Sequence, residues 1–256
     1  MGSPARSLAV LASVVMLGAS CTGSTSSVDP ASLANSTPVT FSTSDGVQLS
    51  GRLFGPESAT AGVVLAHMLP ADQTSWYSFA ERLAGQGYRV LTFNFRGYCS
   101  GGDGGCSQGT KQVNAADVDL QAAVDRLRED GAVSVGIAGA SMGGTAALRV
   151  AATDPKGIAA VATLSAPVAI DRLSVDPQTL SQVSAAKLII AGLDDPSGAA
   201  GAADTIAAGS PQPVREEIVT SDAHGTDLLT SQQGERVQAL LEQFFAQWLR
   251  AAPSPG

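Results

Sequence analysis

The sequence predicts an α/β fold in which helices cover both faces of a mostly parallel sheet. Short apolar runs rich in β-branched residues alternate with segments of helical periodicity along most of the chain. Such runs are typical of strands buried on both faces, which need a layer of helices on each side. Two alternating segments precede them, joined by Ser44-Asp45-Gly46, a strong hairpin signal.

Each predicted strand has its own signal. The opening hairpin is expected over 39–41 and 47–54, on either side of the Asp-Gly turn. Uninterrupted apolar runs bounded by Gly, Pro or polar residues then predict buried strands, and a weaker alternation predicts the last one. These strands are expected at 62–66, 88–95, 133–139, 158–164, 187–191 and 214–220.

The predicted helices carry apolar residues three or four positions apart, and several end at glycines. In the first, Trp76, Phe79 and Leu83 share one face, and Gly85 and Gly87 end it. The helices are expected over 76–86, 113–130, 145–152, 198–208 and 228–250. Only residues 165–186 separate two of the strands, which leaves room for a minimal lid or none.

The N-terminal residues predict export. Residues 1–20 combine Arg6, an apolar run and small residues, as a signal peptide does. Gly18, Ala19 and Ser20 before Cys21 resemble a bacterial lipobox, although Gly18 stands where Leu is usual. We therefore expect residues 21–38 to be a lipidated Cys21 with a flexible tether, residues 39–250 the folded domain and 251–256 a disordered tail. The alternative is an ordinary cleaved signal with an incidental cysteine.

This N-terminus predicts a lipid anchor on the outer face of the cell membrane. Of the three cysteines, Cys99 and Cys106 then remain for a disulfide, because exported proteins meet oxidising conditions. The net charge of −8 argues against a nucleic-acid partner, since little would neutralise phosphates.

The chemistry-bearing motif is Gly139-Ala140-Ser141-Met142-Gly143, a G-x-S-x-G pentapeptide between a predicted strand and a predicted helix. Such a sharp turn requires small residues around the serine, whose hydroxyl then projects from the sheet edge. The Met142 N–H lies at the helix N-terminus, where it can stabilise an oxyanion. A second match around Ser107 has no strand before it, and we interpret it as an accident of composition.

Several segments together resemble the α/β-hydrolase family of serine esterases and dienelactone hydrolases. VLAHMLPADQTSWYSFAERLAGQGYRVLTFNFRG resembles its strand–His-Gly–helix–strand–Arg-Gly block, and GASMGG its nucleophile elbow. LIIAGLDDP resembles its acid-bearing strand, and DAHGTDLL its histidine loop. The resemblance covers about residues 39–250 and implies the α/β-hydrolase fold with chain order nucleophile, acid, histidine.

That order implies roles for the few candidates. Of the two histidines only His224 follows Ser141, so the resemblance makes it the general base. Asp195, three residues after Gly192, is the preferred acid, and Asp194 is the alternative. Asp171 or Asp176 is a third choice.

The resemblance also implies a structural role for His67. We expect a structural role for Asn94 as well, although it stands where related sequences often carry Asp. The second oxyanion donor would be Leu69 or Met68, because Met68 replaces the usual Gly. No metal or organic cofactor is implied. The expected activity is hydrolysis of small carboxylic esters with short to medium acyl groups. The alternatives are a non-catalytic binding protein of the same fold at the envelope, or a thioesterase, peptidase or cofactor-free haloperoxidase.

Overall fold

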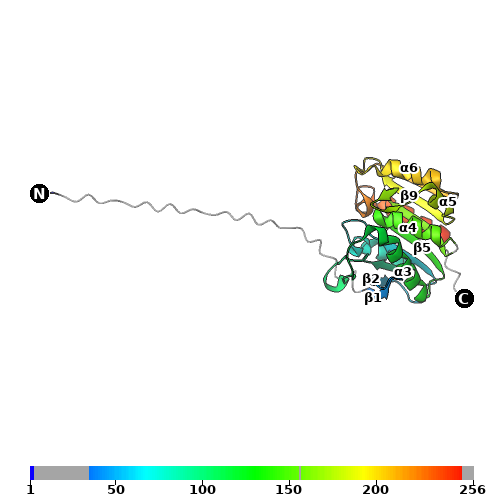
Figure 1. Ribbon diagram of the computed structural model, residues 1–256, viewed down its shortest axis with the longest axis horizontal. Helices are drawn as coiled ribbons and strands as arrows, with labels where there is room; N and C mark the ends of the chain where they lie inside the picture. The colour runs from blue at the N-terminus through cyan, green and yellow to red at the C-terminus, as the bar shows by residue number, and fades with distance from the viewer. Residues whose placement is uncertain (3–34, 156, 250–256) are drawn as a thin grey trace.

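The computed structural model describes residues 1–2, 35–155 and 157–249 (Figure 1). Cys21 and nearly all of the predicted signal peptide and tether, like the predicted tail, lie outside these residues. Within the described residues, no helix has the length and apolar character needed to cross a membrane.

A sheet of eight strands runs through the described part of the chain in the order β1-β2-β4-β3-β5-β6-β9-β10 (Figure 1). The first two pairings, β1 with β2 and β2 with β4, are antiparallel, and the others are parallel. The strands are β1 (Ser36–Ser42), β2 (Gln48–Phe54), β3 (Ala61–Ala66), β4 (Arg89–Phe93), β5 (Ser134–Ala140), β6 (Ile158–Leu164), β9 (Ala186–Gly192) and β10 (Val214–Val219).

Helices cover both faces, as predicted. The main helices are α2 (Tyr77–Gly85), α3 (Ala116–Glu129), α4 (Met142–Thr153), α6 (Ala199–Gly209) and α7 (Gly234–Trp248). Short 3₁₀ segments are η1 (Gln73–Trp76), η2 (Gly102–Gly104), η3 (Val113–Ala115) and η4 (Gly225–Leu229). Alternate residues of each central strand enter two separate apolar clusters, one with α3, α4 and α6 and the other with α2 and α7.

The connection between β6 and β9 is short, as expected. It holds a small ribbon, β7 (Ala169–Ile170) with β8 (Leu173–Ser174), and one short helix, α5 (Pro177–Gln182). The α5 helix packs against α4 and α6, on the face of the sheet that these two helices cover with α3. The parallel strands β3, β5, β6, β9 and β10 end at one edge, which is where such sheets bind their ligands.

Two sequence expectations are wrong in detail. The closing helix does not run from 228 to 250, because η4 and a turn come first and α7 begins at Gly234. The Ser231 hydroxyl accepts a hydrogen bond from the Gln233 N–H at 3.1 Å, which stabilises the turn instead of a helix. Val133, expected inside a buried strand, lies just before β5 and is 82% exposed, and its N–H donates to Thr60 O at 2.7 Å.

Candidate active site

Ser141 lies at the junction of β5 and α4 in a conformation that non-glycine residues rarely adopt, with φ 47° and ψ −115°. Its N–H donates to Leu164 O at 2.9 Å, which ties the turn to β6. The surrounding glycines are required by crowding. A Cβ on Gly143 would lie 2.7 Å from His67 O, and one on Gly144 would lie 2.7 Å from the Ala166 Cβ. The strand–turn–helix predicted around Ser141 is therefore present.

Backbone N–H groups at this turn are available to an oxyanion. Met142 is the first residue of α4, so its N–H has no partner within the helix and lies at the positive end of the helix dipole. Met68 and Leu69, the two candidates for the second donor, lie in the loop after β3, behind His67. The choice between them stays a prediction.

His67 is buried and supports the loop after β3 through both of its ring nitrogens. Its Nδ1 lies 2.9 Å from Met68 O, and its Nε2 accepts the Phe95 N–H at 3.1 Å. Because Nε2 accepts, the proton belongs on Nδ1, which donates to Met68. Burial lowers the pKa of His67 to about 4, so the ring is neutral at pH 7. Both ring nitrogens are thus occupied by backbone, in agreement with the structural role expected for this residue.

Asp195 and His224 meet at the ends of β9 and β10. The Asp195 Oδ2 lies 2.7 Å from the His224 Nδ1. The Asp195 side chain is fully buried, whereas 29% of the His224 side chain is exposed. A buried carboxylate bonded to Nδ1 holds the imidazole in the tautomer whose Nε2 is free to accept a proton.

Asp194, the alternative acid, is exposed, and its N–H donates to Ser221 O at 3.0 Å. Asp171 lies in the exposed turn between β7 and β8. Asp176 caps α5 by accepting the Thr179 N–H at 2.7 Å. Among the described residues only Asp195 of these four carboxylates has a hydrogen bond to His224.

The charge of Asp195 is favoured by its neighbours. Burial raises the pKa of its carboxyl, but hydrogen bonds from Ser197 and His224 outweigh burial, so that the pKa lies below its usual value. The Ser165 hydroxyl also lowers this pKa, although it makes no hydrogen bond of ordinary geometry among the described residues. Asp195 is therefore ionised at neutral pH.

The loop that carries His224 packs directly on the turn at Ser141. Gly225, next to His224, has φ 57°, and a Cβ there would lie 3.4 Å from the Ala140 Cβ and against the Met68 Sδ. Gly192 at the end of β9 similarly faces the carbonyls of Ser221 and Ala223. The loops after β3, β5, β9 and β10 therefore converge at one place, although they are far apart in the sequence.

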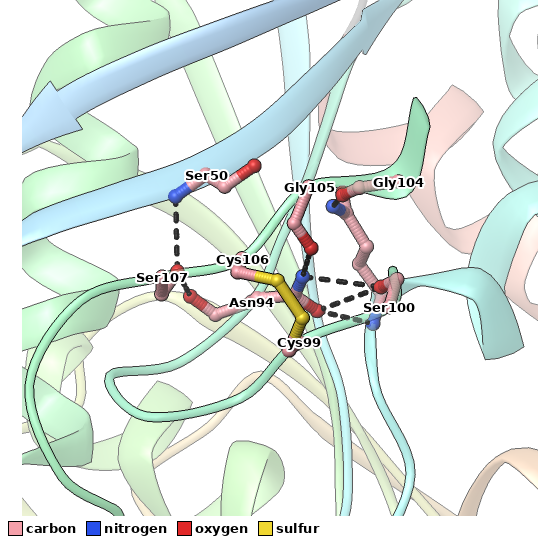
Figure 2. The surroundings of a disulfide bond; sticks show 9 residues. Ser50, Asn94, Cys99, Ser100, Gly104, Gly105, Cys106 and Ser107 are labelled. Atoms are coloured by element: carbon pink, nitrogen blue, oxygen red, sulfur yellow. Dashed lines mark hydrogen bonds between the residues drawn. A yellow bond between two sulfur atoms is a disulfide. The ribbon is translucent and has the colours of Figure 1, made fainter. Parts of the chain in front are cut away.

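The second G-x-S-x-G match has a structural explanation (Figure 2). The Ser107 hydroxyl is buried, donates to Asn94 O at 2.5 Å and accepts the Ser50 N–H at 2.9 Å. The Asn94 side chain is also buried, and its amide bonds to Ser100 Oγ and Gly105 O. Both residues hold the loop after β4 in place, which is the structural role expected for Asn94.

The predicted disulfide between Cys99 and Cys106 is present in the same loop, with the two Cα atoms 4.0 Å apart (Figure 2). Both cysteines are exposed, at the outer side of the network that surrounds Asn94. No group of three or more His, Cys, Asp or Glu side chains in the described residues could hold a metal ion.

Sequence reasoning missed two hydroxyls beside the acid. Ser197 bonds to the Asp195 carboxylate from the same turn, whereas Ser165, after the end of β6, lowers the pKa of this carboxyl without a hydrogen bond among the described residues. The spacing Asp-x-Ser is a turn signal that could have identified Ser197. Ser165 becomes a neighbour only through the sheet order, which the sequence does not state.

The comparisons agree with this architecture. Residues 63–187 match a family model described as alpha/beta hydrolase fold. An esterase from Pyrococcus furiosus has a TM-score of 0.70 at 19% identity, over 86% of this chain and 94% of its own. A dienelactone hydrolase from Anabaena variabilis has a TM-score of 0.68 at 23% identity, over 84% and 98%. A thermophilic esterase from Thermogutta terrifontis has a TM-score of 0.63 at 17% identity, over 82% and 98%.

The comparison with curated proteins finds no match. The structural likenesses, all at low identity, concern the course of the backbone over nearly the whole of each neighbour. Together with the sheet order, the turn at Ser141 and the family match over residues 63–187, they identify this chain as a protein of the α/β-hydrolase fold.

Proposed function

We propose that the protein is a serine hydrolase that cleaves small carboxylic esters through an acyl-enzyme on Ser141. The observation that carries this proposal is the 2.7 Å hydrogen bond between the buried Asp195 carboxylate and His224, whose loop packs at Gly225 against Ala140, next to Ser141. Esterases among the structural neighbours support the same class of reaction.

In the proposed reaction the Ser141 Oγ attacks the ester carbonyl carbon, while the His224 Nε2 takes the hydroxyl proton. The carbonyl oxygen becomes an oxyanion that accepts hydrogen bonds from the Met142 N–H and from Leu69 or Met68. Collapse of this intermediate breaks the bond to the alcohol, which leaves with the proton from His224. Water then attacks the acyl-enzyme while His224 takes one of its protons. The bond from the acyl carbon to the Ser141 Oγ breaks, the Oγ regains a proton from His224, and the carboxylic acid is released.

The size of the substrate follows from the short connection between β6 and β9. The one short helix of this connection, α5, packs against α4 and α6. A site with a minimal lid suits short or medium acyl groups better than long lipids, whose chains need a large apolar cover.

We further propose that the protein is exported and held on the membrane through a lipid on Cys21, which the residues before this cysteine support. Membrane fractionation tests this step. Wild-type protein is expected in the membrane fraction and the Cys21→Ser variant outside it; equal distribution of the two would contradict the anchor.

The test of the catalytic proposal is mass spectrometry of the folded protein after treatment with a fluorophosphonate. We expect one adduct, on the Ser141 peptide, together with ester hydrolysis. Ser141→Ala should lose both and keep the fold, whereas the control Ser107→Ala should keep both. Absence of an adduct on folded wild-type protein would contradict the proposal and favour a binding protein, and an adduct on Ser107 would overturn the choice of nucleophile.

A further inference from the structure

One carboxylate oxygen of Asp195, Oδ1, accepts two hydrogen bonds from the same residue. Ser197 bonds to Asp195 Oδ1 twice, through its N–H at 2.9 Å and through its Oγ at 2.7 Å. The other oxygen, Oδ2, faces the His224 Nδ1. Two donors on Oδ1 fix the rotation of the carboxylate, and therefore fix the direction in which Oδ2 is presented to the imidazole.

Ser197 also contacts the imidazole itself, because its Oγ lies 3.2 Å from the His224 Nδ1. The Ser197 hydroxyl proton is used on Asp195 Oδ1, so the side of its oxygen that faces the ring is a lone pair. A lone pair there favours a proton on Nδ1, shared between Asp195 Oδ2 and Ser197 Oγ. That tautomer leaves Nε2 as the free base.

We propose that Ser197 is a positioning residue for the acid–base pair, which it serves by orienting the carboxylate and keeping the Nδ1 proton in place. This inference rests on the proposed function of that pair. It assigns to Ser197 more than the closing of a turn, since its hydroxyl touches both partners across two loops, after β9 and after β10.

The chain contains a matched control for the turn itself. Thr74 bonds to Asp72 Oδ1 through its N–H at 2.8 Å and its Oγ1 at 2.7 Å, the same pair of contacts that Ser197 makes to Asp195. The Asp72 turn, however, has no hydrogen bond to a histidine among the described residues. Thr74→Ala therefore removes an equivalent turn hydroxyl away from the acid–base pair.

The charged surroundings of the pair stay constant in these variants. Asp194 from the same turn, with Asp222 and Asp227 from the histidine loop, lines a hollow of about 570 Å³ beside it. None of these three carboxylates forms an ion pair within the described part of the chain. Because none is altered, a change in the pH profile of a Ser197 variant reports on the lost hydroxyl.

The experiment compares Ser197→Ala, Ser197→Thr and Thr74→Ala with wild type by steady-state ester hydrolysis over a range of pH. Loss of a hydrogen bond to a charged group at the acid is expected to lower kcat about 10-fold in Ser197→Ala, with KM little changed. The carboxylate loses a donor and becomes more basic, so the acid limb of kcat/KM should move to higher pH. Ser197→Thr, which restores the hydroxyl, should recover most of kcat, and Thr74→Ala should match wild type.

A second readout does not depend on turnover. The downfield NMR resonance of the His224 Nδ1 proton should move in Ser197→Ala and stay in place in Thr74→Ala. An unchanged kcat, acid limb and resonance in Ser197→Ala would overturn the positioning role. If wild type neither hydrolyses esters nor reacts with the fluorophosphonate, yet this resonance moves, the proposed function fails while the positioning of His224 stands.

Discussion

Two neighbouring carboxylates of the same turn have opposite environments. Asp195 is buried, carries hydrogen bonds from Ser197 and His224, and has a lowered pKa, whereas Asp194 is exposed. The family pattern already favoured Asp195 over Asp194, and these contacts show how two adjacent carboxylates come to have different environments. Leu193 and Asp194 are both exposed in the turn after β9, and the side chain of Asp195 is the first after this strand to be buried again.

Neutralising each carboxylate separately tests this difference. Asp195→Asn should lower kcat by about 10⁴-fold, because an amide cannot stabilise the imidazolium and favours the wrong tautomer. Asp194→Asn should change kcat by less than about 10-fold, since it removes only an exposed charge. Steady-state ester hydrolysis measures both. Small and similar losses in the two variants would show that the acid lies elsewhere.

The turn formed by His224 and Gly225 is the element that brings the proposed base towards the proposed nucleophile. Gly225 lies so close to Met68 and Ala140 that it has no room for a side chain. It also has φ 57°, a conformation that costs other residues free energy. The glycine is therefore needed both for the turn and for the contact between loops.

Gly225→Ala should displace His224 and reduce both stability and kcat. We expect the free energy of unfolding to fall by about 1–3 kcal/mol, from strain and from the displaced neighbour. Gly87→Ala is a suitable control, because Gly87 has φ 91° but open space around it. The control should lose stability alone, as urea unfolding and ester hydrolysis measure. An equal loss of kcat in both variants would contradict the role of the contact.

A buried arginine joins the opening hairpin to the helical layer. The Arg96 guanidinium lies 2.8 Å from Asp45 in the hairpin turn and 2.7 Å from Asp119 on α3. The hydrogen bond from Arg96 lowers the pKa of Asp45 to about 2, whereas burial raises the pKa of Asp119. The pKa values of the two carboxyl groups are thus shifted in opposite directions.

The pH dependence of stability should reveal the Asp45 contact. Its pKa is lower in the folded state than in the unfolded state, so the ionised carboxylate stabilises the fold above about pH 4. That contribution is lost as the pH falls towards 2. Because half of the side chain is exposed, we expect less than about 1 kcal/mol. Urea unfolding of wild type and Asp45→Asn should differ at pH 5 and converge near pH 2; a constant difference would contradict this account.

The elements were predictable where one local signal decided them. Continuous apolar runs located β3, β6 and β9 to within a residue or so. A strand that is buried on both faces needs apolar side chains at nearly every position, and this makes its sequence easy to identify. The break before α7 was missed, since its apolar spacing continues through a turn held by the Ser231 hydroxyl. The resemblance to the family favoured Asp195, but Ser197 was overlooked because its second partner, His224, follows another strand.

At the scale of the whole molecule, the disulfide closes a surface loop on the network around Asn94 (Figure 2). The disulfide restricts the conformations of the unfolded chain and belongs to neither apolar cluster, so its effect should be seen in the free energy of unfolding. For a loop with a sequence separation of seven, the chain-entropy model predicts about 2–3 kcal/mol.

The variant Cys99→Ser with Cys106→Ser measures this contribution. Its free energy of unfolding should be lower than that of wild type by about that amount, with the same dependence on urea concentration. Adding a reducing agent should destabilise wild type and leave the double variant unchanged. Equal stability of the two oxidised proteins would mean that the loop is already ordered in the unfolded chain.

The place of β10 at the end of the sheet order also affects when the protein becomes reactive. Ser141 follows β5 in the middle of the sheet, whereas His224 follows the last strand of the chain. A chain in which only β1 to β6 have assembled still lacks the base proposed for its nucleophile. On the proposed mechanism, the serine stays inert until the final strand docks, and a half-synthesised chain is protected from acylation by esters around it.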